Sequence, residues 1–334
     1  MAGKLSSTYI ELKEGELLFK EFRLACYRFT LCPQNEGIVL PFFKGTIFLQ
    51  EKFKNILYRL SCKLKQRKCP DCFFNLHCPY ALLYEKINFR GWSSCRSRYL
   101  PAPFVWQPPL EKKTDYIAEE KIIFNLILLG RGISFLEVFI RAFQEFAAEG
   151  SQKQGKLILK NVLAVNPFTG KSRLIFESEH NHITKTELVT SGEEIELWAE
   201  RMPEVSRLSL LFVTPTGLKE QDGYLEEPYF YHIIKALVTR ASIMYYFHHH
   251  NRELEIHYRN FLDKAEQVRK VRDYTRFVSW EKSSRGSSWG RGFLGEVEYT
   301  GKLHAFLPLL KLGEFMHLGE NAAFGLGRYR IKRS

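Results

Sequence analysis

The order of predicted elements indicates an α+β protein made of two tandem ferredoxin-like domains, each with the βαββαβ order of RNA-recognition-type folds. Two observations support this prediction. Strand and helix patterns alternate in that order between residues 17 and 165, and a strand followed by a long helix appears again after residue 205. At 334 residues the chain is long enough for each half to bury its own core. No close sequence repeat accompanies the two halves, so the duplication is inferred from element order alone.

In the first half, apolar and β-branched stretches alternate with amphipathic ones. The predicted elements are a strand at 17–30, a short helix at 46–60, an extended proline-rich stretch at 101–109, a buried strand at 121–130, a helix at 134–150 and a strand at 156–165. Ser134 and Glu137 have the spacing of a capping box, which predicts the start of the second helix.

The second half begins in the same way. An alternating segment at 206–219 predicts a strand that breaks at Pro215, and apolar residues at helical spacing predict a helix at 229–247. The remaining strands are expected within 285–331, where glycines, bases and short apolar runs alternate with almost no helix-favouring stretch. A polar, acidic stretch at 192–204 separates the halves, so the predicted domains are 1–198 and 199–334.

A glycine-rich loop close to the C-terminus is the strongest candidate for a ligand-binding element. Gly319, Gly325 and Gly327 are expected where the backbone turns with φ > 0 or approaches a ligand closely. Such a loop could also donate backbone N–H groups to phosphates. No Gly-Lys-Ser/Thr motif follows, which excludes a nucleotide-triphosphate P-loop. Taken singly, each glycine is explained as well by an ordinary β-turn.

The charge of the chain favours a polyanionic partner. The formal net charge is +12 and the isoelectric point is near 9.3. Residues 259 to 334 contain fifteen Lys and Arg against eight Asp and Glu, so the basic surface is expected there. The N-terminus lacks a secretory pattern, and the longest apolar run is far shorter than the roughly 20 residues needed to span a bilayer. The sequence therefore predicts a cytoplasmic protein without a transmembrane helix.

Several residues near the C-terminus are candidates for RNA binding. Trp289 lies among glycines and arginines in a segment too polar to be core, so its ring could stack on a base. The predicted RNA-binding residues are Arg285, Trp289, Arg291, Lys302, Gly319, Gly325, Gly327 and Arg328.

Four of the seven cysteines, Cys62, Cys69, Cys72 and Cys78, lie within seventeen positions. In a reducing compartment this clustering suggests metal more than disulfides, and four thiolates can close a tetrahedral structural zinc site. His77 is a substitute fourth ligand. Buried free thiols explain the pattern equally well, because a zinc knuckle usually has a C-x2-C pair on both sides. A zinc-stabilised surface that docks partner proteins is a further hypothesis.

Five segments resemble the CRISPR-associated endoribonucleases that cut precursor guide RNA within its repeats, the Cas-six family of the repeat-associated (RAMP) superfamily. The segments, in the expected order, are CPDCFFNLHCPYALLYE, EEKIIFNLILLGRGISFLEVFIRAF, LSLLFVTPTGLK, GFLGEVEYTGKLHAF and HLGENAAFGLGRY. The last contains the glycine-rich loop of the family.

The resemblance implies two ferredoxin-like domains, CRISPR repeat RNA bound in a basic cleft, and cleavage without a metal. The RNA's own 2′-hydroxyl would attack, leaving 2′,3′-cyclic phosphate and 5′-hydroxyl ends and producing guide crRNA. An internal nucleophile requires the protein chiefly to align the hydroxyl with the phosphorus and to neutralise the developing charge.

The chain departs from this family at one position. Many members carry a catalytic histidine near the start of the first helix, and this chain has no histidine before His77. Lys44 and Lys52 are the nearest bases, and Tyr27 on the first strand is a candidate partner in proton transfer. A solvated basic helix face is the commoner explanation of such lysines. The missing histidine also favours an alternative function, a non-catalytic subunit that holds crRNA inside a CRISPR effector complex.

Overall fold

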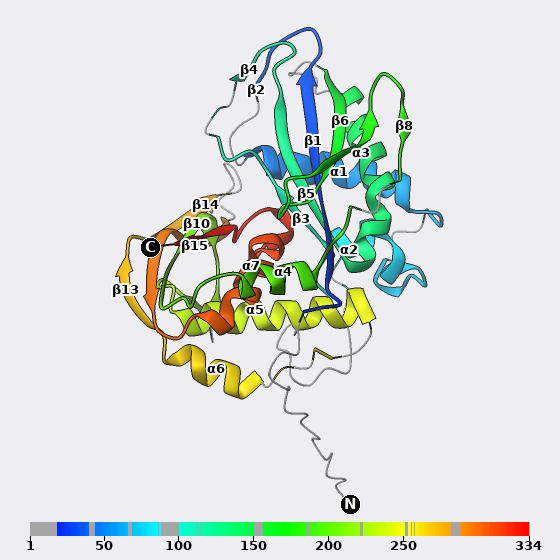
Figure 1. Cartoon of the computed structure of the whole chain (residues 1–334). Coiled ribbons are helices and arrows are strands. Elements are labelled where there is room, and N and C mark those ends of the chain that lie inside the picture. The colour runs from blue at the N-terminus through cyan, green and yellow to red at the C-terminus, as the bar shows by residue number, and fades with distance from the viewer. Residues whose placement is uncertain are drawn as a thin grey trace, which may run out of the picture.

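The protein consists of two antiparallel sheets with helices packed against them (Figure 1). The computed structural model describes residues 19–39, 44–65, 69–85, 87, 100–111, 113, 115–149, 156–185, 188–220, 223–250, 253–254, 256, 258–281 and 288–333. None of the helices in these ranges is both long and apolar enough to cross a bilayer.

The first sheet has the strand order β3-β5-β1-β6-β7-β8, with β9 also paired to β1. Its strands are β1 (Arg23–Pro33), β3 (Phe104–Gln107), β5 (Ile122–Leu129), β6 (Leu157–Val165), β7 (Ser172–Glu177), β8 (His182–Ile183) and β9 (Thr190–Ser191). The helices of this half are α1 (Lys44–Ser61), α2 (Pro79–Tyr84) and α3 (Leu136–Glu149), and a small ladder joins β2 (Ile38–Val39) to β4 (Asp115–Tyr116). Strands β1, β3, β5 and β6 with α1 and α3 form the predicted βαββαβ unit.

The second sheet repeats this arrangement with the order β13-β15-β10-β16, and β14 also pairs with β15. Its elements are β10 (Arg207–Thr216), α5 (Phe230–Tyr245), α6 (Tyr258–Glu266), β13 (Arg269–Asp273), β14 (Arg276–Glu281), β15 (Ser288–Thr300), α7 (Leu307–Met316) and β16 (Tyr329–Arg333). A hairpin of β11 (Lys219–Glu220) and β12 (Gly223–Tyr224) follows β10, and α4 (Gly192–Glu200) joins the halves. The matching strand order confirms two tandem ferredoxin-like domains.

Side chains on opposite faces of the first sheet enter two different cores. On β5, Leu126 and Leu128 pack with α1 and α3, whereas Ile127 and Leu129 join the core of the second half. This division follows from the alternation of side chains along a strand. The face of the first sheet that α1 and α3 leave open therefore lies against the second half of the chain.

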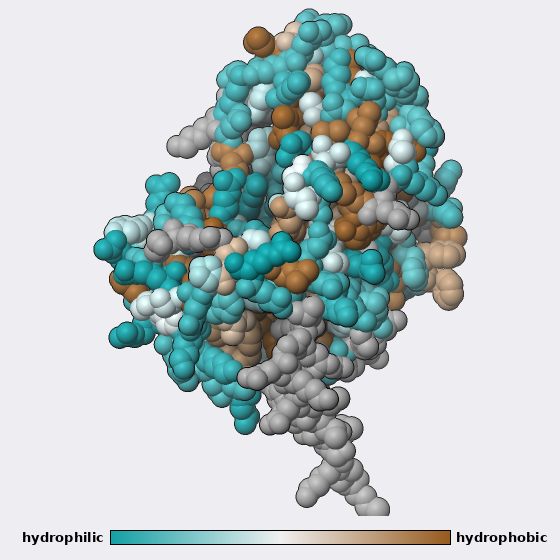
Figure 2. Space-filling model, viewed as in Figure 1, coloured by the Kyte–Doolittle hydropathy of each residue, from teal (hydrophilic) through white to brown (hydrophobic). Residues whose placement is uncertain are grey.

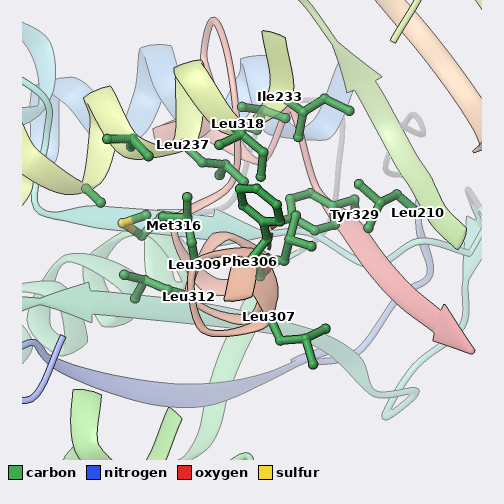
Figure 3. Close-up of a cluster of buried hydrophobic side chains, with 14 of the residues drawn as sticks. Leu210, Ile233, Leu237, Phe306, Leu307, Leu309, Leu312, Met316, Leu318 and Tyr329 are labelled. Carbon is green, nitrogen blue, oxygen red and sulfur yellow. Dashed lines mark hydrogen bonds between the residues drawn. The ribbon is translucent and has the colours of Figure 1, made fainter. Parts of the chain in front are cut away.

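The second core forms around α5 and α7 (Figure 3). Leu237 from α5, Leu309 from α7 and Tyr329 of β16 are among the buried side chains of this cluster. Tyr329 donates a hydrogen bond to the Leu310 carbonyl oxygen at 2.6 Å, so its buried hydroxyl is satisfied. This packing fixes β16, which carries residues of the candidate site, against the rest of the second half.

The expectation that residues 285–331 contain almost no helix is wrong, because α7 lies within them. Helix α7 is apolar nearly all round and most of its side chains are buried, so it shows no amphipathic stripe. Gly313, inside this helix, is also a residue type that in a sequence indicates the end of a helix. A Cβ at Gly313 would lie 2.1 Å from the Tyr329 hydroxyl, so close packing and not a turn accounts for this glycine.

The predicted capping box at Ser134 is also wrong. Ser134 lies in a 3₁₀ helix (Gly130–Phe135) that precedes α3, and its hydroxyl donates to the Arg131 carbonyl oxygen at 2.8 Å. A capping box forms instead at Ser191 and Glu194, at the start of α4. Helix α4 thus occupies most of the stretch interpreted as a polar boundary, and its buried Ile195 joins the second core.

Candidate nucleic-acid interface

A cleft of about 550 Å³ opens between the two halves. Residues of β1, β3, β5 and the end of β6 line one side, and residues of α7 and β16 line the other. Hydrophilic residues dominate the surface on both sides of the junction (Figure 2). The polar side chains that matter most below are Arg28, Gln107, Asn125, Glu314, Arg328 and Arg330.

Three polar residues form a row across the open face of the first sheet. Gln107 on β3 is opposite Asn125 on β5, and Asn125 is opposite Arg28 on β1. Asn125 interrupts the apolar strand because its side chain faces this cleft and not the core. In the sequence, the feature that could have indicated this row of polar residues is Asn125, a single amide within an otherwise apolar strand.

The opposite wall contributes two arginines from the start of β16. Arg328 is partly buried and Arg330 is exposed, and both line the cleft. Burial, with Arg330 nearby, lowers the pKa of the Arg328 guanidinium to about 10, while Glu314 acts in the opposite direction. Within the described part of the chain, Arg28, Arg328 and Arg330 form no ion pairs. Three arginines without carboxylate partners suit a polyanion.

A buried histidine connects the two walls. His317 follows α7 with φ +58° and is 0% exposed. Its Nδ1 lies 3.1 Å from the Leu326 carbonyl oxygen, and its Nε2 lies 3.1 Å from Gln107 Nε2. Burial, followed by the charges of Arg328 and Arg240, holds the pKa of His317 well below its usual value. The ring is therefore neutral and acts as a structural link between β3 and the glycine-rich loop.

Positive φ angles confirm the prediction for the three loop glycines. The values are +82° at Gly319, +94° at Gly325 and +67° at Gly327. Each position is also crowded by the protein itself. A Cβ at Gly327 would lie 1.6 Å from the Leu318 carbonyl oxygen, and one at Gly325 would lie 2.9 Å from the Trp106 carbonyl oxygen. The second contact places the loop against β3.

The backbone amides of Glu320 and of the last part of the loop are engaged within the chain. The expectation that the loop offers amides to phosphates therefore stays a prediction for residues 319 and 321 to 323 alone. The N–H groups of residues 324 to 328 all donate to acceptors within the chain. Gly327 N–H, for example, donates to the Pro215 carbonyl oxygen at 2.9 Å. This part of the loop therefore positions neighbouring side chains, and any contact of residues 324 to 328 with an anion has to come from side chains such as Arg328.

The structure does not gather the predicted basic residues at one place. Arg291 and Lys302 are both exposed, but Arg291 lies near the start of β15 and Lys302 follows its end. The nine-residue step from Arg291 to Thr300 along the extended strand corresponds to about 30 Å, so Arg291 and Lys302 lie near opposite ends of β15. Trp289 belongs to β15, and Arg285 lies outside the described residues. Among the predicted RNA-binding arginines that are described, only Arg328 lines the cleft.

The predicted catalytic residues occupy the helix side of the first sheet. Lys44 begins α1. Lys52 Nζ lies 3.5 Å from the Phe146 carbonyl oxygen on α3, and burial lowers its pKa, while Glu149 acts in the opposite direction. Tyr27 is 2% exposed in the first core, and burial, followed by Cys26, raises its pKa to about 12. A phenol this basic and this buried is a poor proton carrier at neutral pH.

The four clustered cysteines surround the end of α1 and the start of α2. Burial raises the pKa of Cys69 to about 11, and smaller contributions come from Glu85 and from the other three thiols of the cluster. The Cys78 thiol, whose pKa burial raises, accepts hydrogen bonds from the backbone N–H groups of Ala81 and Tyr80. Within the described ranges no three histidine, cysteine or carboxylate side chains converge as they would around a metal.

Sequence families match both halves of the chain. A family described as an N-terminal domain matches residues 22–188, and the family described as CRISPR-associated endoribonuclease Cas6 matches residues 210–329. The second match includes α7 and the glycine-rich loop. No curated protein matches the chain.

Solved structures share the whole fold at low identity. A product complex of a Thermus thermophilus Cas6 is 17% identical, with a TM-score of 0.54 over 92% of this chain and 100% of that one. A second Cas6 product complex is 14% identical, with a TM-score of 0.51 over 93% and 100% of the two chains.

A partial Cas6-RT-Cas1–Cas2 complex is 11% identical, with a TM-score of 0.57 over 95% of this chain and 47% of that one. At these identities the structures establish the fold alone. The Cas6 match in the C-terminal half and the two ferredoxin-like sheets agree with each other and with the resemblance of the glycine-rich segment. The C-terminal half of the chain therefore matches the family described as CRISPR-associated endoribonuclease Cas6, and the whole chain has the fold of the solved Cas6 proteins.

Proposed function

We propose that the protein binds CRISPR repeat RNA in the cleft between its two sheets and cleaves it to produce crRNA. The observation that carries this proposal is the group of three arginines, Arg28, Arg328 and Arg330, which line the cleft without ion-pair partners in the described part of the chain. The Cas6 match, which ends at residue 329, covers Arg328. Product complexes of Cas6 proteins with the same fold agree with RNA as the ligand.

In the proposed reaction the 2′-hydroxyl of the RNA attacks the adjacent phosphorus and the 5′-oxygen of the next nucleotide leaves. The products are a 2′,3′-cyclic phosphate and a 5′-hydroxyl end. The nucleophile comes from the substrate, so the protein has to align the strand and stabilise the developing negative charge. Lys44 and Lys52 are the proposed proton-transfer groups, and burial lowers the pKa of Lys52, so more of it is unprotonated at neutral pH than for an ordinary lysine. Both lysines belong to α1 on the helix side of the first sheet, so this proposal requires the RNA to extend from the cleft to that side.

The reaction is tested by incubating the full-length protein with repeat RNA in excess EDTA and analysing the ends of the products. We expect cleavage with a 2′,3′-cyclic phosphate. Lys44→Ala and Lys52→Ala should reduce the single-turnover cleavage rate roughly 10²-fold or more, with RNA affinity nearly unchanged. Arg59→Ala is a matched control on α1, because Arg59 pairs with Glu145 and Glu149 at the surface. Tight binding without cleavage at any pH or metal concentration would contradict the enzymatic proposal.

The second candidate function is a non-catalytic subunit that holds crRNA within an effector complex. It is favoured by the absence of a histidine before His77. This alternative predicts stable binding of RNA with no change in its length. It is abandoned if the lysine variants separate cleavage from binding as expected above.

We propose in addition that Cys62, Cys69, Cys72 and Cys78 hold a structural zinc ion. All four thiols lie close enough for each of the other three to raise the pKa of Cys69, and they join α1 to α2 through two 3₁₀ turns. Two backbone N–H groups point at the Cys78 sulfur, an arrangement that favours a thiolate.

Metal analysis of the purified full-length protein tests the zinc proposal. We expect one zinc ion per chain, lost in Cys72→Ser and retained in Cys26→Ser, whose thiol lies on β1 outside the cluster. Reduced protein that takes up neither zinc nor cobalt during anaerobic reconstitution would show that the four residues are free thiols.

A further inference from the structure

The contacts that join Leu326, His317 and Gln107 show which atom is the donor and which is the acceptor in each hydrogen bond. The Leu326 carbonyl oxygen can only accept, so His317 Nδ1 carries the proton in their 3.1 Å contact. The buried ring is neutral, and its Nε2 is therefore an acceptor. The group facing Nε2 at 3.1 Å has to be a donor, and it is the amide nitrogen of Gln107.

This assignment fixes the orientation of the Gln107 amide. With Nε2 directed to His317, Oε1 of Gln107 accepts a hydrogen bond from Asn125 Nδ2 at 3.4 Å. Rotating the amide by 180° would place its oxygen against the lone pair of His317 Nε2. The buried histidine thus selects one of the two orientations of the Gln107 amide. Because Gln107 then presents its oxygen to Asn125, the Asn125 amide has to direct its nitrogen towards Gln107.

Asn125 presents the remaining polar atoms of this chain to the cleft. Its side chain is half-buried and lines the cleft, and its hydrogen bond to Gln107 uses only one N–H. The second N–H and Oδ1 form an adjacent donor and acceptor in a plane. With the amide held in this orientation, Oδ1 accepts from an exocyclic amino group while the second N–H donates to the neighbouring ring nitrogen; a base with a ring N–H beside a carbonyl, such as inosine, would have to be turned over to pair. Adenine offers an amino group beside a ring nitrogen on two of its edges, and unpaired RNA exposes both.

We propose that the cleft binds an unpaired base bearing an exocyclic amino group, adenine in particular, and that Asn125 recognises it while Gln107 and His317 hold the Asn125 amide in position. This inference rests on the proposed RNA-binding function and adds the base that the cleft selects. Arg28 is the cross-strand neighbour of Asn125, so a phosphate or a stacked base beside the recognised nucleotide meets a guanidinium. Arg328 and Arg330 face the strand from the other wall.

Two short RNA probes test the inference on the full-length wild-type protein. Oligoadenylate and oligoinosinate differ at the amino group, which inosine replaces with a carbonyl. Anisotropy titrations at constant salt should show oligoadenylate binding on the order of tenfold more tightly. Oligocytidylate and oligouridylate form a second pair with the same amino-to-carbonyl change. Because these comparisons need no protein variant, they hold even where a substitution impairs folding.

Variants then assign the preference to residues. Asn125→Ala and Asn125→Asp should bring the affinity ratio of the two purine probes close to one. Gln107→Met should lower the ratio with little loss of overall affinity, which a merely structural role of Gln107 does not predict. Ser134→Ala, in the 3₁₀ turn before α3 and outside the cleft lining, is the control and should keep the ratio.

The outcomes separate this inference from the function on which it rests. Equal and tight binding of the two purine probes by the wild type would overturn base recognition and leave the RNA-binding proposal standing. A preference for oligocytidylate over oligoadenylate would overturn the assignment to adenine. Failure of the wild type to bind any of the four probes or its repeat RNA would remove both proposals.

Discussion

Gln107 Nε2 lies 3.1 Å from His317 Nε2, although 210 positions separate the two residues in the chain. Gln107 ends β3 in the first sheet, and His317 follows α7 in the second half. This contact lies where the glycine-rich loop approaches β3, so the loop, the buried histidine and the cleft form one connected structure. Changes at any of the three are expected to affect RNA binding together.

The arginines of the cleft should determine the salt dependence of RNA binding. Arg28→Ala and Arg330→Ala should each weaken binding and reduce the slope of log K against log[salt] by about 1 for each phosphate that the variant no longer neutralises. Titrations at several salt concentrations measure this slope. Arg59→Ala, on α1 and paired with Glu145, should leave it unchanged. An unchanged slope in the two cleft variants would place the RNA elsewhere.

Two glycines with similar backbone angles should respond differently to alanine. Gly170 has φ +69° and open space around its Cβ position, whereas Gly327 has φ +67° and a carbonyl oxygen 1.6 Å from that position. Gly170→Ala should lower the free energy of unfolding by about 1 kcal/mol through backbone strain alone. Gly327→Ala adds a backbone clash and should cost several times more. Urea unfolding of both variants measures the difference, and equal losses would show that the loop relaxes freely.

Capping gives a second matched pair. Ser191→Ala removes the side-chain oxygen that accepts the Glu194 N–H at the start of α4 and should lower the free energy of unfolding by about 1 kcal/mol. Ser134→Ala removes only a local hydrogen bond in an exposed 3₁₀ turn and should cost less than half as much. Thermal or urea unfolding compares them. The reverse ranking would restore the capping box predicted at Ser134.

Stability should decrease in acid because of a buried histidine. His248 is 2% exposed, and burial lowers its pKa from 6.5 to about 3, with a smaller opposing effect from the Pro101 carbonyl oxygen. Between these values the unfolded chain binds a proton that the folded chain does not, so stability falls as pH decreases from 6.5 towards 3. The slope contributed by one such group is at most about 1.4 kcal/mol per pH unit.

Replacing His248 isolates its share of this acid dependence. His248→Gln does not titrate and should flatten the decline measured by urea unfolding between pH 6.5 and 4, relative to the wild type. His182→Gln at an exposed hairpin position should not. If the free energy of unfolding declines equally with decreasing pH in the wild type and in His248→Gln, then His248 binds a proton in the folded protein as readily as in the unfolded chain.

Most of the fold could be predicted from local patterns. Alternating or continuous apolar runs identified β1, β5, β6 and β10, and helical spacing identified α1, α3 and α5, with boundaries shifted by a few residues. Helix α7 was missed because a helix buried on nearly all sides has no polar face and therefore no periodicity to detect. Helix α4 was missed because its charged first turn resembles a linker.

The candidate site was predictable only in part. The three loop glycines and Arg328 were identified, because glycine and clustered bases are informative in the sequence itself. Arg28, Asn125 and His317 were not, because each is an isolated polar residue within an apolar or ordinary segment. Their common role depends on which face of a strand each occupies and on which strand lies beside it.

The sequence by itself determined the two βαββαβ units, the positive φ angles of the loop glycines and the basic character of the C-terminal region. These properties depend on local periodicity, on the absence of a Cβ and on composition, all of which are readable within a short segment. Only the tertiary structure decided that the amides of residues 324 to 328 are engaged within the chain, that β3 meets the end of α7, and that three arginines and an amide share one cleft. Those outcomes depend on how the open face of the first sheet packs on the second half, which is set by contacts between residues hundreds of positions apart.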